Sequence, residues 1–254
     1  MRPFFPCRLA GSSSLTLALA LGVASHGARA GEEIFFSQLP SVQSVARLPQ
    51  SLADAPGSVT VIDRDMIRAS GARHLNDLLR LVPGFQTHVF NTDAPARVTY
   101  HGLSDEDFSP RVQVLIDGRS QYSPLFRGGV NWSVLPIALE DIERIEVVRG
   151  SNSAAYGSNA FLGVINIISV DPSLAQGLSL MAGHGNQGVR DYGVRGGGKL
   201  GEAGHFRFSY AQQDDDGLAD RYDWRDYFKA HQFDARASLA LNDQDTLDLF
   251  AGHA

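Results

Sequence analysis

The residues that follow Pro172 alternate between apolar and polar side chains and show no helical periodicity. The clearest stretches are HFRFSYAQ (205–212), FDARASLAL (233–241) and TLDLFA (246–251). In each of them one face is apolar and the other carries charged or small side chains, with a period of two residues that fits a β-strand. Such strands occur in soluble antiparallel sheets and in β-barrels of outer membranes.

The lengths of the connections favour the barrel. The turns LGEAG (200–204) and NDQD (242–245) are short and fall at one end of the predicted strands, whereas the connection 214–229 is long and falls at the other end. Short turns on one side and long loops on the other are typical of outer-membrane barrels. Residues 177–254 provide for about five strands of roughly ten residues, too few for the chain to close a barrel of its own. We therefore expect an incomplete transmembrane β-barrel, and a chain that is a fragment or truncated form of a longer protein.

The N-terminus has the features of a secretory signal peptide. Arg2 and Arg8 precede an apolar stretch over 15–23, and Ala28-Arg29-Ala30 fits the small-x-small cleavage rule. The sequence predicts cleavage after residue 30. An uncleaved anchor is the alternative, although the apolar stretch is shorter than the roughly 20 residues that span a bilayer as a helix. The single cysteine, Cys7, lies in this segment, so the mature chain would contain no disulfide.

The charge balance excludes nucleic acid as an expected partner. The signal segment holds three arginines and no acidic residue, so the 22 basic side chains fall to 19 against 28 acidic ones, a formal charge near −9. An enzyme is not expected either, because the sequence has no serine-nucleophile elbow and no metal-ligand spacing. Gly193–Lys199 nearly spells a phosphate-binding loop, but no helix is predicted after it. We expect no cofactor and no bound metal.

The middle of the chain has a mixed α/β pattern. SVTVI (58–62) alternates as a strand, and Asp63 can cap a short helix that runs through Arg68 and ends at Gly71. A second helix is predicted from the spacing of Leu75, Leu78, Leu79 and Val82, which form one apolar face.

Two further strands are predicted downstream. They cover RVTYHGL (97–103) and RVQVLIDGRSQYS (111–123), and the second folds back as a hairpin at Asp117-Gly118.

One stretch combines a charged strand, a turn of small residues and an apolar strand: IERIEVVRGSNSAAYGSNAFLGVINIIS (142–169). Together with APGSVTVIDRDMI, LNDLLRLVPGF and VLIDGR, which precede it in that order, it resembles the plug domain of TonB-dependent outer-membrane receptors. The resemblance covers residues 51–169. It implies an α+β plug domain, a small mixed β-sheet with short helices, followed by antiparallel β-strands of the barrel wall. The expected division is a signal peptide (1–30), an N-terminal TonB-interacting segment (31–50), the plug (51–172) and the first strands of the barrel (173–254).

The resemblance also implies a function. Receptors of this family take up a scarce chelate across the outer membrane of Gram-negative bacteria, and they are energised by TonB, which contacts the N-terminal segment. Ferric siderophore is the first candidate ligand, and cobalamin, haem and nickel chelates stay open. The expected partners are TonB, the chelate and outer-membrane lipid. The alternative is a soluble periplasmic binding or interaction module whose last strands form a small soluble sheet.

Candidate site residues follow from the same resemblance. The TonB contact is placed on GEEIFFSQLP (31–40), where the residues of interest are Glu32, Glu33, Ile34, Phe35 and Phe36. This segment departs from the family's usual box, which has Thr and Val positions, so a disordered leader is the alternative. The ligand is expected to meet loops at 90–96, 105–110 and 122–131, with the candidate residues Asn91, Asp93, Asp105, Tyr122, Phe126 and Arg127.

An ionic latch between plug and barrel is placed on the charged strand of the 142–169 stretch. Its candidates are Glu143, Arg144, Glu146 and Arg149, and the resemblance implies that Glu146 and Arg149 face charges of the barrel wall. A solvated strand face is the alternative. Charges suit such a surface because water can replace their partners when the plug moves.

Overall fold

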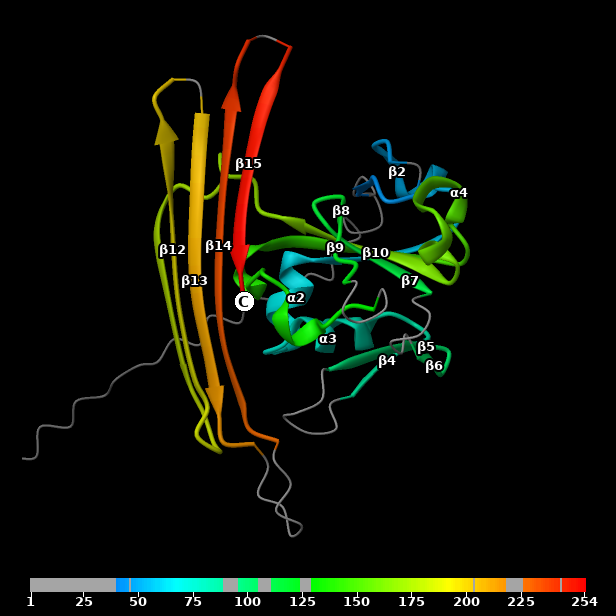
Figure 1. The fold of residues 1–254 in the computed structure, drawn as a ribbon, viewed down its shortest axis with the longest axis horizontal. Coiled ribbons are helices and arrows are strands. Elements are labelled where there is room, and N and C mark those ends of the chain that lie inside the picture. Colours follow the sequence, from blue (N-terminus) through cyan, green and yellow to red (C-terminus); the bar gives the residue numbers. More distant parts are fainter. Residues whose placement is uncertain are drawn as a thin grey trace, which may run out of the picture. The chain divides into compact units, whose positions relative to one another are not determined.

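The computed structural model describes residues 40–45, 47–88, 96–104, 111–123, 129–202, 204–217, 226–242 and 244–254. The Asn91, Asp93, Asp105, Phe126 and Arg127 loop candidates and the N-terminal candidates Glu32, Glu33, Ile34, Phe35 and Phe36 lie outside these residues. Figure 1 shows a mixed α/β portion followed along the chain by long antiparallel strands.

The mixed α/β portion has a five-stranded sheet with the order β3-β9-β10-β7-β8. Its strands are β3 (Ser58–Asp63), β7 (Val112–Ile116), β8 (Arg119–Ser120), β9 (Ile142–Arg149) and β10 (Gly163–Ser169). β10 runs parallel to β7 and antiparallel to β9, so the predicted mixed sheet is confirmed.

Shorter elements surround this sheet. A three-stranded sheet consists of β4 (Phe85–His88), β5 (Arg97–Tyr100) and β6 (Leu103–Ser104), and a two-stranded one of β1 (Ser41–Val42) and β2 (Gln50–Ser51). The helices are η1 (Leu52–Asp54), α2 (Arg64–Ser70), α3 (Leu75–Leu78), η2 (Leu79–Leu81), η4 (Trp132–Val134), η5 (Leu139–Asp141), α4 (Ser153–Tyr156) and η6 (Ser158–Ala160).

Helix α2 begins and ends where the sequence predicts. The Asp63 carboxylate accepts a hydrogen bond from the Met66 amide at 2.8 Å, which satisfies one of the free N–H groups of the first turn. Gly71 follows the helix at φ 66°, the left-handed conformation that glycine adopts without strain.

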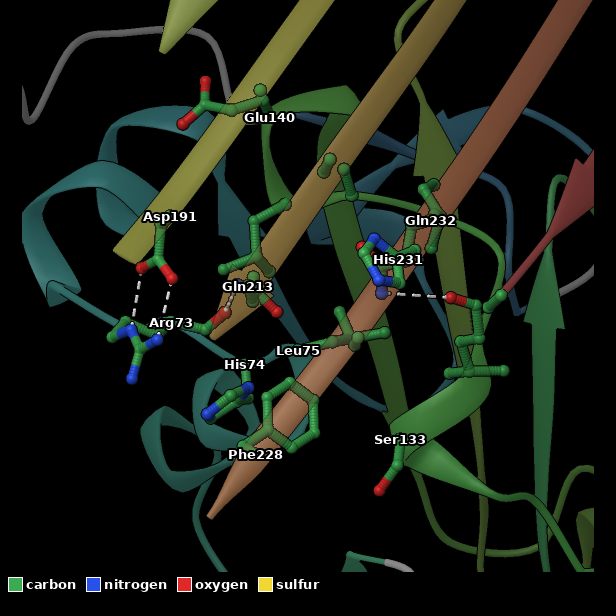
Figure 2. A pocket seen from close by; sticks show the side chains of 18 of the residues that line it. Arg73, His74, Leu75, Ser133, Glu140, Asp191, Gln213, Phe228, His231 and Gln232 are labelled. Carbon is green, nitrogen blue, oxygen red and sulfur yellow. Dashed lines mark hydrogen bonds and ion pairs between the residues drawn. The ribbon is translucent and has the colours of Figure 1, made fainter. Parts of the chain in front are cut away.

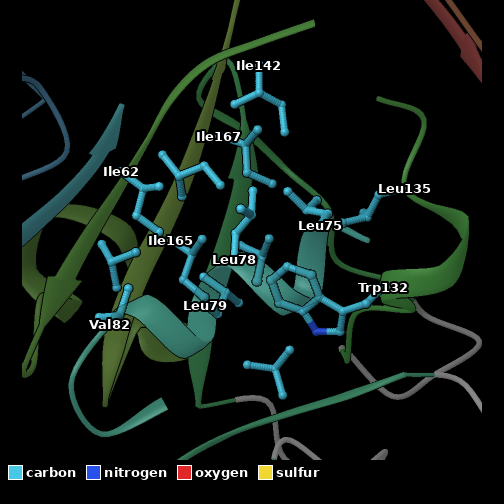
Figure 3. Close-up of a cluster of buried hydrophobic side chains, with 14 of the residues drawn as sticks. Ile62, Leu75, Leu78, Leu79, Val82, Trp132, Leu135, Ile142, Ile165 and Ile167 are labelled. Carbon is cyan, nitrogen blue, oxygen red and sulfur yellow. The ribbon is translucent and has the colours of Figure 1, made fainter. Parts of the chain in front are cut away.

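The second predicted helix forms as α3 and the 3₁₀ turn η2, and its apolar face is buried. Leu75, Leu78, Leu79 and Val82 are at most 7% exposed, and they pack with Ile165 and other residues of the sheet in one cluster (Figure 3). Burying an aliphatic side chain of this size contributes roughly 1.5–3 kcal/mol. The core therefore joins the helices to the sheet.

The predicted strand over 97–103 is interrupted. β5 ends at Tyr100, a turn follows at His101 (φ 51°) and Gly102 (φ 73°), and β6 then pairs back with β5. Gly102 supplies the left-handed backbone that allows this reversal. The hairpin at Asp117-Gly118, which joins β7 to β8, forms as predicted.

After residue 172 the chain forms a five-stranded antiparallel sheet in which each strand pairs with the next, β11-β12-β13-β14-β15. The strands are β11 (Gly177–His184), β12 (Arg190–Leu200), β13 (Gly204–Asp215), β14 (Phe228–Ala240) and β15 (Thr246–His253). The predicted five strands and their short turns are confirmed. Gly193–Lys199, which nearly spells a phosphate-binding loop, lies inside strand β12, and the next described element is strand β13, not a helix.

The two faces of this sheet differ as the alternation predicts. On β13, Phe208 and Tyr210 are 39% and 40% exposed, whereas Arg207 and Ser209 are 1% and 4% exposed. The charged and small side chains of this strand thus face protein, and its aromatic side chains face outward.

Candidate functional site

A cavity of about 1070 Å³ lies between the mixed domain and strands β11–β14. Its walls include side chains from α3, the η4–η5 region and the four strands (Figure 2). Three groups of charged residues connect the two parts of the chain at and beside this cavity. We treat this interface as the candidate functional site.

Arg73 makes the first connection. Its guanidinium donates two hydrogen bonds to Asp191 of β12 and one to Asp215 of β13, all at 2.8 Å, and the first pair is drawn in Figure 2. Gln213 also donates to the Arg73 carbonyl at 2.6 Å. The hydrogen bonds to Asp191 raise the pKa of Arg73 above its ordinary value, against the opposing effect of burial. A planar guanidinium suits this site because it can donate to two carboxylates at once.

His74 follows Arg73 and extends this contact. Its ring meets the Phe228 ring of β14 edge-on, with 4.5 Å between the ring centroids. Burial lowers the pKa of His74 below its ordinary value of 6.5, so the imidazole is neutral at neutral pH.

Asp141, the last residue of η5, makes the second connection directly before β9. Its carboxylate is buried and lies 3.1 Å from Arg207 Nη1 of β13 and 3.8 Å from Arg195 Nη1 of β12. Asp141 and Arg207 form an ion pair in which neither carboxylate oxygen accepts a hydrogen bond. Arg207 also pairs with Asp234 of β14, so one buried cation bridges carboxylates from both parts of the chain.

Asp117 makes the third connection. Its carboxylate accepts hydrogen bonds from the backbone and hydroxyl of Ser169, and it lies 3.8 Å from Arg236 Nη1 of β14. Arg236 in turn donates to the Ser169 hydroxyl at 3.1 Å. The Arg119 guanidinium lies 3.9 Å from the centre of the Phe250 ring of β15, a cation–π contact beside this group.

These contacts correct the predicted latch. Glu146 does not face the strand wall: its side chain is buried within the mixed domain, where it accepts hydrogen bonds from Gln43, Ser44 and Arg144. Arg144 bridges Glu143 and Glu146 on its own strand. The physical reason is that β9 is a central strand, whose two faces are both covered by the domain. Arg149 is half-buried, and its pairing with a barrel wall stays a prediction, as does that of Glu143.

Tyr122 is the loop candidate that the structure describes. It is 49% exposed, and its backbone amide donates a hydrogen bond to the Ser120 hydroxyl at 3.3 Å. Its part in ligand binding stays a prediction.

The residues that do connect the two parts were not among the predicted latch. They include Arg73, Asp117, Asp141, Asp191, Arg207, Asp215 and Arg236. A signal was present for two of them, since Arg207 and Arg236 lie among the small or polar positions of strands whose other face is apolar. A charge at such a position needs a partner inside the wall.

The arrangement is suited to reversible contact. Ion pairs and hydrogen bonds at an interface can exchange their partners for water, and each contributes little net free energy when water is available. Within the described residues, no group of three or more His, Cys, Asp and Glu side chains is placed to hold a metal ion. The described helices include none long and apolar enough to cross a membrane.

Comparison with known families decides what the mixed domain is. Residues 51–164 match the family model described as TonB-dependent Receptor Plug Domain. This chain carries a TonB-dependent receptor plug domain. The plug is thus the mixed domain, the strands β11–β15 belong to the wall that follows it, and the fold class predicted from the sequence is confirmed.

Curated relatives of the plug and the wall strands are longer proteins. The vitamin B12 transporter BtuB of Vibrio cholerae serotype O1 is 30% identical over 216 residues, which are 79% of this chain and 34% of that protein. The iron-regulated outer membrane virulence protein of the same species is 32% identical over 162 residues, 62% of this chain and 24% of that protein. The chain spans about a quarter to a third of the length of these relatives.

Solved structures share the fold of plug and strands. FpvA of Pseudomonas aeruginosa, bound to a heterologous pyoverdine, superposes with a TM-score of 0.69 at 20% identity, over 85% of this chain and 27% of that one. The siderophore receptor PiuA of Acinetobacter baumannii gives a TM-score of 0.66 at 21% identity, over 85% and 28%. Like the receptor family, this plug is located in the outer membrane of Gram-negative bacteria.

Proposed function

We propose that this chain is the N-terminal part of a TonB-dependent outer-membrane receptor that imports a scarce chelate. A ferric siderophore is the first candidate ligand. The five described wall strands cannot enclose a channel, because plugged transporters have about 22 strands. We therefore propose that transport requires the rest of the wall and that these residues alone transport nothing.

The observation that carries the proposal is the polar attachment of the plug. Its connections to β12, β13 and β14 are ion pairs and hydrogen bonds made by Arg73, Asp117 and Asp141. When the plug shifts, water can take over these contacts, whereas an apolar seal would lose its buried area. An attachment of this kind supports a plug that moves during uptake.

The TonB contact is assigned to residues 31–40, as the sequence suggested. Extended segments bind partners by adding a strand, in which main-chain N–H groups supply much of the affinity. Ile34→Pro removes one such N–H, and we expect it to abolish energised uptake while ligand binding is kept. Ile34→Val is the matched control and is expected to transport normally. Normal uptake by the proline variant would show that TonB contacts the receptor at another segment.

Cobalamin is the second candidate ligand, because BtuB relatives of this plug reach 30–32% identity. The two ligands separate in one experiment with the full-length receptor in a strain that lacks its own receptors. Growth on a ferric siderophore as the iron source supports the first candidate, and growth on cobalamin as a required vitamin supports the second. Rescue by neither, with the receptor present in the outer membrane, would overturn both of these candidates and leave haem and nickel chelates to be tested in the same strain.

The soluble-module alternative makes a different prediction for the chain of 254 residues. It requires residues 31–254 to be monomeric and soluble without detergent. The receptor proposal requires them to need detergent or to aggregate, because Leu178, Leu180 and Phe208 face outward on the wall strands.

A further inference from the structure

The segment Ser41–Val45 lies between the proposed TonB contact and the plug sheet. It includes β1, which pairs with β2, and three of its side chains are buried: Val42, Ser44 and Val45. The Leu52 amide donates to the Pro40 carbonyl at 3.1 Å. We call Ser41–Val45 the strap.

One buried carboxylate accepts three hydrogen bonds from the strap. Glu146 Oε2 accepts hydrogen bonds from the amide of Gln43 and the amide of Ser44, both at 2.9 Å, and from the Ser44 hydroxyl at 2.6 Å. Its other oxygen accepts from Arg144 Nε at 2.9 Å. A buried carboxylate is tolerated only when such donors satisfy it.

Two asparagines complete the contact. Asn152 Nδ2 donates to the carbonyl oxygens of Ser44 and Val45, at 3.3 and 3.0 Å, and Asn166 Nδ2 donates to the Ser44 hydroxyl at 3.1 Å. Just beyond the strap, the Arg47 guanidinium lies 4.5 Å from the centre of the Tyr156 ring. Glu146, Asn152, Tyr156 and Asn166 all belong to the 142–169 stretch. We call these four residues the cradle.

The contact with the strap gives a reason for polar residues inside the sheet, where Asn166 also accepts a hydrogen bond from the Gly118 amide at 3.3 Å. Asn166 and Glu146 face each other on the central strands β10 and β9, positions that apolar side chains would otherwise fill. A polar cradle binds the strap through directional bonds that water can replace, and Arg144 continues to neutralise Glu146 after the strap leaves.

We infer that the strap is a releasable element whose hold on the plug is set by Glu146, and that it detaches before the plug sheet opens when the N-terminal segment is pulled. The second half of this inference rests on the proposed function. The role of Glu146 does not rest on it, because this role concerns the plug at rest.

The resting state is tested by hydrogen exchange on the full-length receptor. In Glu146→Gln the side-chain amide cannot accept from both the strap and Arg144 on two oxygens, so we expect the amides of Gln43 and Ser44 to exchange at least tenfold faster. Glu143→Gln is the matched control: it removes a neighbouring carboxylate that has an ion pair with Arg144 and no contact with the strap. Equal strap exchange in wild type and Glu146→Gln would overturn the role of Glu146. Asn152→Ala provides a second variant, with a smaller acceleration expected.

Detachment is tested by thiol labelling in cells. Val45→Cys is buried in the strap, and Val164→Cys is buried in β10 of the same apolar cluster. With ligand and energised TonB, we expect the labelling rate at position 45 to rise at least tenfold and that at 164 to stay unchanged. Simultaneous labelling of both positions, or of neither while uptake proceeds, would overturn the order of release. Failure of every chelate to be imported would overturn the proposed function and leave the exchange result standing.

Discussion

The carboxylate of Asp141 and the guanidinium of Arg207 meet at 3.1 Å with both side chains 1% exposed, one from the plug and the other from wall strand β13. Neither group would be stable there alone, because an unpaired buried charge is costly. This ion pair therefore fixes the position of the plug against the wall strands. Loss of either Asp141 or Arg207 should weaken the contact.

The first prediction concerns the carboxylates that share Arg207. Asp141→Asn leaves Arg207 paired with Asp234, and we expect it to lower the free energy of plug unfolding by about 2 kcal/mol. Asp141→Asn/Asp234→Asn leaves the buried cation without a carboxylate, so its loss should exceed the sum of the single losses. Urea unfolding of the full-length receptor, followed by a fluorophore at the exposed Leu81→Cys, measures each value. Additive losses would show that the three groups do not act together.

The second prediction concerns the Arg73 guanidinium, which donates to two carboxylates. Arg73→Lys keeps the charge but cannot donate to Asp191 and Asp215 in the same geometry, and we expect it to lower plug stability by about 1 kcal/mol. Arg68→Lys, at an exposed residue of the preceding helix α2, is the control and should be neutral. The same urea titration compares the two. A neutral Arg73→Lys would mean that charge alone holds this end of the plug.

The third prediction is a pH dependence from His74. Burial lowers its pKa in the folded state below the ordinary 6.5, so the unfolded chain binds more protons as the pH falls past 6.5. Stability is therefore complete above pH 6.5 and decreases below it, until folded His74 is itself protonated. His74→Gln should flatten this decrease in urea titrations between pH 5 and 8, and His184→Gln, at an exposed position, should not. An unchanged profile in His74→Gln would assign the effect to other groups.

The fourth prediction concerns Gly163 at the start of β10. A Cβ at this position would lie 2.6 Å from the Val148 carbonyl oxygen of the neighbouring strand, which is backbone and cannot turn aside. We expect Gly163→Ala to destabilise the plug by about 2 kcal/mol. At Gly183 of β11 the nearest atom to an added Cβ is 3.5 Å away, so Gly183→Ala should be tolerated. Equal stability of the two variants would show that β9 and β10 can separate slightly without cost.

Local patterns predicted the elements and the core of the plug well. Asp63 and Gly71 mark both ends of α2 because capping depends on neighbouring residues. The buried face of α3 and the two faces of β13 follow from spacing alone. The break in 97–103 was missed because His101 precedes a glycine whose left-handed backbone outweighs the strand pattern.

The long-range ionic contacts were not predictable in the same way. Arg73 and Asp191 are 118 positions apart in the sequence, and Glu146 and Ser44 are 102 positions apart. A local sequence pattern therefore cannot predict either contact. Glu146 was assigned to the wall because charges on a strand suggest an exposed face. On β9 the strap covers that face, and the strap has no distinctive sequence.

The pairing of β3 with β9, in which Ser58 lies opposite Arg149, has a consequence for how the plug forms during export. Its first strand has no partner in the sheet until the chain through residue 149 has been delivered, and β7 waits for β10 in turn. Contacts of such sequence separation form slowly. The sheet of the plug is therefore complete only after residue 169 has been delivered, and until then its N-terminal strands lack their partners.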